Sequence, residues 1–153
     1  MTCEIKSIGL NKHRLLVDDK NVTVAFFSEL KFGVENYCGK HVINFEINKK
    51  IEDYIKEIEN IIFQKLPGIP YSSIRKNKWN PKLKPILRTY LRYITKDGKK
   101  ILKTIVKQED EVVMLKNIKS TNKLKIHIYL DHIWIQKDTT IGLCWYIDLI
   151  NVL

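Results

Sequence analysis

The sequence has few of the residues that bind metals or form disulfide bonds. Its 153 residues include three cysteines and four histidines, and no two cysteines lie at a CxxC spacing. An odd number of widely separated cysteines argues against a disulfide scaffold and for a reducing compartment inside a cell. None of the histidines is paired with a cysteine at the spacing of a zinc site. The sequence therefore predicts no metal site and no cofactor.

Long apolar runs are also missing. No window approaches the ~20 apolar residues that a membrane span requires, and the first residues hold no apolar segment of signal-peptide length. Apolar residues nevertheless make up 44% of the chain, and the mean hydropathy is −0.22, values typical of a globular protein. We expect residues 1–153 to form a single soluble domain that is neither secreted nor bound to a membrane.

Acidic residues are scarce in one segment of the chain. Between Lys65 and Lys107 there are thirteen Lys and Arg residues and a single acid, Asp97, so the formal charge of this segment is +12. The other residues together carry −2, and the segment therefore accounts for the whole net charge of +10. Charge concentrated in this way can neutralise a polyanion along one surface. The alternative is that these lysines are only solvated surface residues of a chain rich in lysine. A lysine bias spread evenly along the chain, however, would not leave the other residues with a slightly negative charge.

One amphipathic helix is predicted over residues 51–66. Isoleucines recur at i, i+4, i+7 and i+11 from Ile51, while Glu and Lys residues occupy the opposite face. Asn48 is a suitable N-cap, and Pro67 with the following glycine ends the helix. We expect the apolar stripe to pack against a sheet.

The other apolar segments are typical of strands. Apolar alternation, or apolar runs between turn residues, predicts strands over 15–17, 22–27, 41–47, 86–95, 100–107, 112–115, 123–135 and 142–149. The first two are expected to form a hairpin, and Asp97-Gly98 predicts a second hairpin between 86–95 and 100–107. This order predicts a β-rich α+β fold, and we expect an OB-fold-like antiparallel barrel plugged by the helix, with extra N-terminal strands. Periodicity alone does not separate this barrel from another α+β fold.

The basic segment contains two candidate binding regions. A proline-containing loop over 68–85 places cations around one tryptophan, and the predicted hairpin places cations around one tyrosine on a shared face. Cations that follow phosphates and rings that stack bases are what single-strand binding requires. The predicted contact residues are Arg75, Lys76, Lys78, Trp79, Lys82, Arg88, Tyr90, Arg92, Lys103 and Lys107. For Trp79 a plug against the core is an equal alternative, whereas Trp145 is expected in the core because its row is otherwise aliphatic.

The C-terminal half resembles a known family. The run from Lys125 to Ile135, a short turn and the strand Ile141 to Ile147, which contains Gly-Leu-Cys-Trp, resemble the closing strands of OB-fold single-stranded DNA-binding proteins of large DNA viruses and some phages. The basic hairpin around its Asp-Gly turn is similar to their DNA-contacting strands. This resemblance covers roughly residues 70–153. It implies a non-catalytic, sequence-tolerant single-stranded DNA-binding protein in viral DNA replication or recombination, located in the host cytoplasm or nucleus.

Other functions stay open at this point. An RNA-binding or protein-interaction module would use the same basic face, because the 2′-hydroxyl contact that separates RNA from DNA is not visible in a sequence. A small nuclease would need clustered carboxylates or a positioned histidine pair. The basic segment offers only Asp97, in a turn where a turn residue is expected. We therefore expect no enzymatic activity, and we leave self-association of the chain open.

Overall fold

A computed structural model describes residues 2–76, 84–136 and 139–153 of the chain. Its helices are α1 (Lys49–Lys65) and the short 3-10 helix η1 (Leu115–Asn117). Its strands are β1 (Cys3–Gly9), β2 (Lys12–Val17), β3 (Lys20–Asn21), β4 (Thr23–Glu29), β5 (Val34–Tyr37), β6 (Lys40–Glu46), β7 (Ile69–Tyr71), β8 (Ile74–Arg75), β9 (Ile86–Leu91), β10 (Tyr93–Lys96), β11 (Lys99–Leu102), β12 (Ile105–Gln108), β13 (Glu111–Val112), β14 (Lys123–Gln136) and β15 (Thr140–Val152). Neither described helix is long and apolar enough to cross a membrane. The predicted strand-rich α+β class with one amphipathic helix is confirmed.

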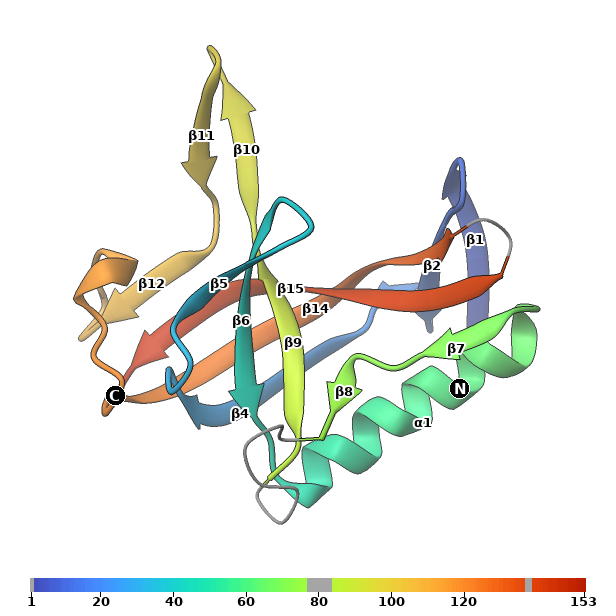
Figure 1. The fold of residues 1–153 in the computed structure, drawn as a ribbon, viewed down its shortest axis with the longest axis horizontal. Coiled ribbons are helices and arrows are strands. Elements are labelled where there is room, and N and C mark those ends of the chain that lie inside the picture. Colours follow the sequence, from blue (N-terminus) through green and yellow to red (C-terminus); the bar gives the residue numbers. More distant parts are fainter. Residues whose placement is uncertain (1, 77–83, 137–138) are drawn as a thin grey trace.

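Most strands belong to one open, mixed sheet (Figure 1). Its order is β1-β2-β14-β15-β9-β6-β5, and β4 pairs with β14 beside β2. The 13-residue β15 runs antiparallel to β14 but parallel to β7, β9 and β12. The prediction of a closed antiparallel barrel is therefore wrong. Parallel neighbouring strands are joined by long crossover connections rather than by tight turns. The turn residues that predict hairpins therefore cannot predict these parallel pairs.

The first predicted hairpin has the right strands but the wrong pairing. β2 turns through Asp18 and Asp19, which both have positive φ, into the two-residue β3. β4 then leaves β2 and pairs along its whole length with β14, from Thr23 to Glu29. The prediction that residues 15–17 pair with 22–27 is therefore wrong, because β4 finds its partner about a hundred residues later in the chain.

The second predicted hairpin, over residues 86–107, is split into two parts. Its turn at Asp97 is confirmed, but only β10 and β11 form the hairpin, which projects from the large sheet (Figure 1). β9 and β12 lie in the large sheet and do not pair with each other. Thr104 fixes the base of the projecting hairpin: its hydroxyl accepts from the amide of Arg92 at 2.9 Å and donates to the carbonyl of Ile147 at 2.6 Å.

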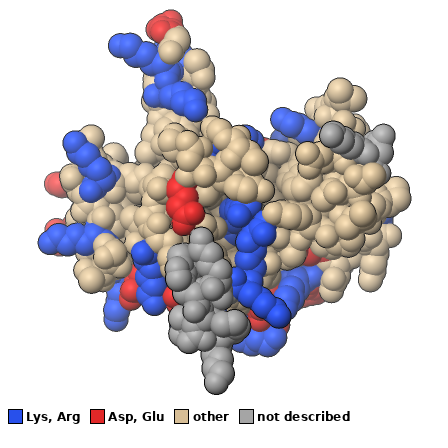
Figure 2. All heavy atoms as spheres, in the orientation of Figure 1, with Lys and Arg blue, Asp and Glu red and all other residues tan. Residues whose placement is uncertain are grey.

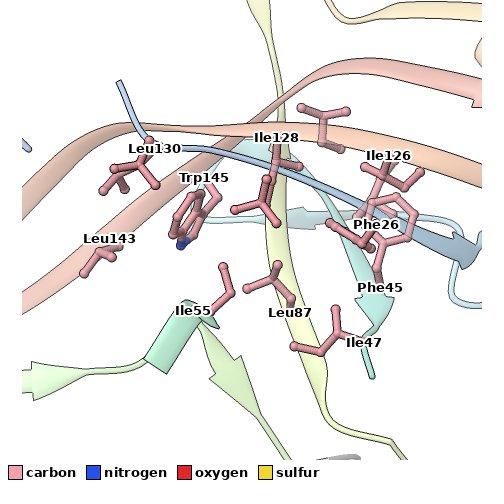
Figure 3. Close-up of a cluster of buried hydrophobic side chains, with 14 of the residues drawn as sticks. Phe26, Phe45, Ile47, Ile55, Leu87, Ile126, Ile128, Leu130, Leu143 and Trp145 are labelled. Atoms are coloured by element: carbon pink, nitrogen blue, oxygen red, sulfur yellow. The ribbon is translucent and has the colours of Figure 1, made fainter. Parts of the chain in front are cut away.

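The core lies where α1 and the strands of the large sheet converge (Figure 3). Alternate residues of β14, including Ile126 and Ile128, are almost fully buried, and Trp145 of β15 has no exposed surface. The helix contributes Ile55 to the same cluster. Asn48 caps α1 as predicted, since its side chain accepts a hydrogen bond from a first-turn amide at 2.9 Å. Each fully buried aliphatic side chain contributes roughly 1.5–3 kcal/mol to stability.

A β-bulge changes which face the last residues of β15 occupy. Strict alternation predicts Leu149 inside and Ile150 outside. The register with β14 shifts at Asp148, and as a result Ile150 is buried and Leu149 is partly exposed.

One carboxyl group is buried between α1 and the segment that joins β7 to β8. Glu59 is 3% exposed and accepts hydrogen bonds from the hydroxyl of Ser72 at 2.7 Å and from the amide of Ser73 at 3.3 Å. Ser73 also accepts a hydrogen bond from the indole of Trp145 at 3.2 Å. Burial raises the pKa of Glu59 above its ordinary value. These contacts hold the start of β8 against the core.

The raised pKa of Glu59 predicts a pH-dependent stability. As pH rises, the unfolded chain releases this proton first and the folded chain retains it, so the free energy of unfolding falls until pH passes the folded pKa. We expect Glu59→Gln to lose this decline while keeping an acceptor for Ser72. Urea unfolding from pH 4 to pH 7, at about half-unit steps, measures it. Parallel stability curves for the two proteins would contradict the assignment.

Candidate nucleic-acid interface

A groove of about 440 Å³ lies where β8, β9, β14 and β15 meet the turns that join β1 to β2 and β5 to β6. We call it the cation groove. Four cations and four aromatic rings line it: Lys12, Lys40, Arg75, Arg88, Tyr37, Tyr71, Tyr90 and Trp134. The described lining residues include no Asp or Glu. The walls therefore combine positive charge with ring faces and lack a neutralising carboxylate.

Two arginines enter the groove from neighbouring strands. Arg75 ends β8 and Arg88 lies in β9, and β8 pairs with β9. The Arg88 guanidinium stands 3.8 Å from the ring centre of Tyr37. The Arg75 guanidinium lies 4.7 Å from the ring centre of Tyr71 and donates a hydrogen bond to its hydroxyl. These rings orient the guanidinium groups by cation–π contact but do not neutralise them.

The two guanidinium groups have unused hydrogen-bonding capacity. The Nε atoms of Arg75 and Arg88 are buried and have no hydrogen-bond partner among the described residues. No ion pair between described residues includes an arginine. Burial, and then the charge of Arg88, lower the pKa of Arg75. Buried donors without partners are costly, and an anionic acceptor would satisfy them best.

An aromatic pair lies at one end of the groove, over a glycine. Trp134 of β14 pairs with Gly142 of β15, and Gly142 pairs with Tyr71 of β7. A Cβ atom at Gly142 would lie 2.1 Å from Cζ2 of Trp134. The missing side chain thus lets the indole approach the backbone of β15, and the Trp134 and Tyr71 ring centres are 5.8 Å apart.

Three tyrosines form a row across the sheet, which we call the tyrosine row. Tyr129 of β14 pairs with Tyr146 of β15, and Tyr146 pairs with Tyr90 of β9. Both neighbouring ring-centre distances are 6.1 Å. Residues in register on adjacent strands share a face, so the row continues the surface that Tyr90 begins in the groove. Burial raises the pKa of all three hydroxyls, which therefore stay uncharged at neutral pH.

Cations stand over both ends of the tyrosine row. The Arg92 guanidinium lies 5.9 Å from the ring centre of Tyr129, and Lys40 Nζ lies 5.7 Å from that of Tyr90. Two acids are also near: Asp148 is exposed beside Tyr129, and Asp131 lies 2.7 Å from Nδ1 of the neighbouring histidine. That hydrogen bond stabilises the carboxylate and lowers the pKa of Asp131.

The described residues show little that suits hydrolytic chemistry. No group of three or more His, Cys, Asp or Glu side chains among them is arranged to hold a metal ion. Cys144 lines the cation groove, but burial raises the pKa of its thiol to about 12, and a protonated thiol is a poor nucleophile.

Comparison with known proteins supports the fold. No protein-family model and no curated protein sequence matches the chain significantly. Among solved structures, gp2.5, a single-stranded DNA-binding protein encoded by bacteriophage T7, matches with a TM-score of 0.55 over 86% of this chain and 91% of that chain. The two proteins share a fold. Their sequence identity is 9%, so the likeness confirms the resemblance drawn from the C-terminal strands at the level of the fold and shows no sequence family.

The structure brings together four of the predicted contact residues. Arg75, Arg88 and Tyr90 lie in the cation groove, and Arg92 lies at the far end of the tyrosine row. Lys76 lines an adjoining hollow with both groove arginines, in which Glu35 is the acid among the described residues.

Two further predicted contact residues, Lys103 and Lys107, do not join this surface. Both line a different groove: Lys107 lies in β12, which pairs with β15 and β13 rather than with β9, and Lys103 lies between β11 and β12. The prediction that they share a ribbon face with Tyr90 is therefore wrong. Lys78, Trp79 and Lys82 lie outside the described residues. Figure 2 shows the consequence: on the face in view, basic side chains form separate groups rather than one stripe.

Several residues of this surface were missing from the sequence prediction. Tyr37 and Lys40 flank a turn that the chain folds over the groove, and no local signal marks them as contacts. Tyr129 and Tyr146 stand at outward positions of alternating strands, which could have identified them as an outward-facing, half-buried aromatic pair. Trp134 had no clear assignment from sequence, and its place over a glycine settles that it lines the groove.

The glycine beneath the indole gives a test of this geometry. We expect Gly142→Ala to lower the free energy of unfolding by about 1–3 kcal/mol, because the new methyl group overlaps Trp134. In a double-mutant cycle with Trp134→Ala, most of that destabilisation should disappear. Gly9→Ala is the matched control, since a Cβ atom there meets nothing within 4 Å. An equal cost with and without the indole would show that the overlap does not explain the glycine.

Proposed function

We propose that this chain is a non-catalytic protein that binds single-stranded DNA with little dependence on sequence. The strand would lie in the cation groove and along the tyrosine row. The single observation that carries the proposal is the pair of half-buried arginines, Arg75 and Arg88, which face aromatic rings and have no carboxylate partner among the described residues. The shared fold with a phage single-stranded DNA-binding protein supports it.

Phosphate groups supply what the arginines lack. A phosphate oxygen accepts hydrogen bonds in the planar fork geometry that guanidinium groups offer, and the Nε donors of Arg75 and Arg88 have no partner among the described residues. Lys12 and Lys40, both exposed at the groove walls, extend the positive surface. Each phosphate that the protein neutralises releases condensed counterions, so binding should weaken as salt increases.

The rings supply contacts that any base can use. Stacking on an aromatic side chain contributes about 1–3 kcal/mol per base and tolerates every sequence, because every base has a π face. Trp134 with Tyr71 at one end, and Tyr146 with Tyr129 at the other, offer two such platforms beside the arginines. In a duplex the π faces of the bases are stacked on one another and are not exposed. These aromatic platforms therefore favour unpaired strands.

The wider role follows from the same resemblance. We propose that the protein acts in viral or phage DNA replication or recombination, where unpaired DNA accumulates. RNA is the alternative ligand, since it presents the same phosphates and bases. Displacement of bound labelled DNA by unlabelled DNA and by RNA of matched sequence separates the two, and we expect DNA to compete at lower concentration.

Removal of one groove arginine tests its binding to phosphate. We expect Arg88→Gln to weaken binding of a labelled oligothymidine of about 15 nucleotides and to reduce the salt slope by about 0.7 for each phosphate that is no longer neutralised. Fluorescence polarisation across a salt series measures both quantities. Lys119→Gln, an exposed loop residue before β14, removes the same charge and should change neither. Equal effects of the two variants, or no binding by the unaltered protein at low salt, would refute the proposal.

The centre of the tyrosine row tests base stacking. We expect Tyr146→Ala to weaken binding by about 1–3 kcal/mol while leaving the salt slope nearly unchanged. Tyr146→Phe keeps the ring and should bind almost as the unaltered protein does. Thermal unfolding of each variant checks that the sheet is intact. Equally weak binding by the alanine and phenylalanine variants would show that the hydroxyl, not the ring face, is responsible.

A further inference from the structure

A second groove, of about 960 Å³, lies among β5, β11, β12, β13 and η1. We call it the aliphatic groove, because Leu, Ile, Val and Met residues form most of its lining. Four of them are well exposed: Val34 at 43%, Ile105 at 45%, Met114 at 58% and Val112 at 75%. An exposed groove lined by apolar side chains is a candidate site for another molecule to cover.

The charged residues of this groove all have one sign. Among the described lining residues they are Lys103, Lys107 and Lys116. None of the three is in an ion pair between described residues. The acidic turn of Glu109 and Asp110 joins β12 to β13 but does not line the groove. The groove therefore offers an aliphatic floor and a positive rim whose lysines form no ion pair between described residues.

This lining suits a protein segment better than a nucleic acid. Tyr93 is the aromatic residue among its described lining residues. Its ring centre already lies 5.2 Å from that of His41 and 6.0 Å from Lys100 Nζ. Aliphatic side chains bury leucine or phenylalanine well but offer no face on which bases stack. Met114 adds a side chain that adapts to different apolar partners.

We infer that the aliphatic groove binds an acidic segment of a protein partner. Apolar side chains of that segment enter the floor, and its carboxylates pair with the lysines of the rim. A hydrophobic centre within a charged rim is the usual anatomy of such an interface, and rim charges chiefly set the encounter rate and its salt dependence. Lys103 and Lys107, which the sequence assigned to DNA, thus serve partner binding. The inference does not depend on the proposed DNA binding.

The test uses the full-length protein and a fluorescein-labelled peptide of about twelve residues, in which Asp and Glu alternate with Leu and Phe. Fluorescence anisotropy should show binding that weakens with salt. Peptides with Ser in place of the acids, or in place of the apolar residues, should bind at least about tenfold more weakly. The double variant Lys103→Gln, Lys107→Gln should weaken peptide binding about fivefold or more and leave oligothymidine binding unchanged.

Further variants separate this site from the cation groove. Val112→Ser with Met114→Ser changes two exposed residues, so the fold should persist while peptide binding falls. Arg88→Gln should leave peptide binding intact, whatever its effect on DNA. No peptide binding by the unaltered protein, or binding that survives removal of the apolar residues, would overturn the inference. Lysine variants that lose DNA instead of peptide would assign the groove to nucleic acid, and self-association abolished by the serine variants would assign it to a second copy of the chain.

Discussion

The antiparallel pairing of β14 with β15 is the constraint on which the molecule depends. These two strands pair from Leu124 to Gln136, and every other strand of the large sheet joins one of them directly or through one or two intervening strands. Side chains alternate between the two faces of a strand, so one register decides both the core and the candidate binding surface. The pairing that buries Trp145 also turns Tyr146 and Tyr129 outward and sets them side by side. Core packing and site geometry are therefore not independent properties here.

Much of the fold could be predicted because its strongest signals are local. The isoleucine stripe of α1, its cap at Asn48 and the alternation of β14 are read over a few residues, and each is confirmed. Sheet order could not be predicted in the same way. The parallel pairs of β15 with β9 and β12 join segments that no turn connects, and the bulge at Asp148 reverses the last alternation. A barrel inferred from hairpin signals alone therefore failed at these long-range pairs.

The candidate site could be predicted for residues that lie both in the basic segment and in a strand of the large sheet. Arg75, Arg88 and Tyr90 were found because they lie in the basic segment and in strands that remain in the large sheet. Lys103 and Lys107 lie in the same segment but follow the projecting hairpin, and their side chains line another groove. A count of charges along the sequence cannot predict that this hairpin separates β9 from β12. The tyrosines of the C-terminal strands carry no charge, so the same criterion passed over them.

The two groove arginines also couple the stability of the fold to what occupies it. Like charges held together in a half-buried site work against the folded chain, because the unfolded chain separates and hydrates them. Any polyanion that enters the groove relieves this repulsion and so stabilises the native state increasingly as its concentration rises. If DNA binds here as proposed, the empty protein would be the less stable form and the one more readily degraded. Its abundance in a cell would then rise and fall with the supply of its ligand.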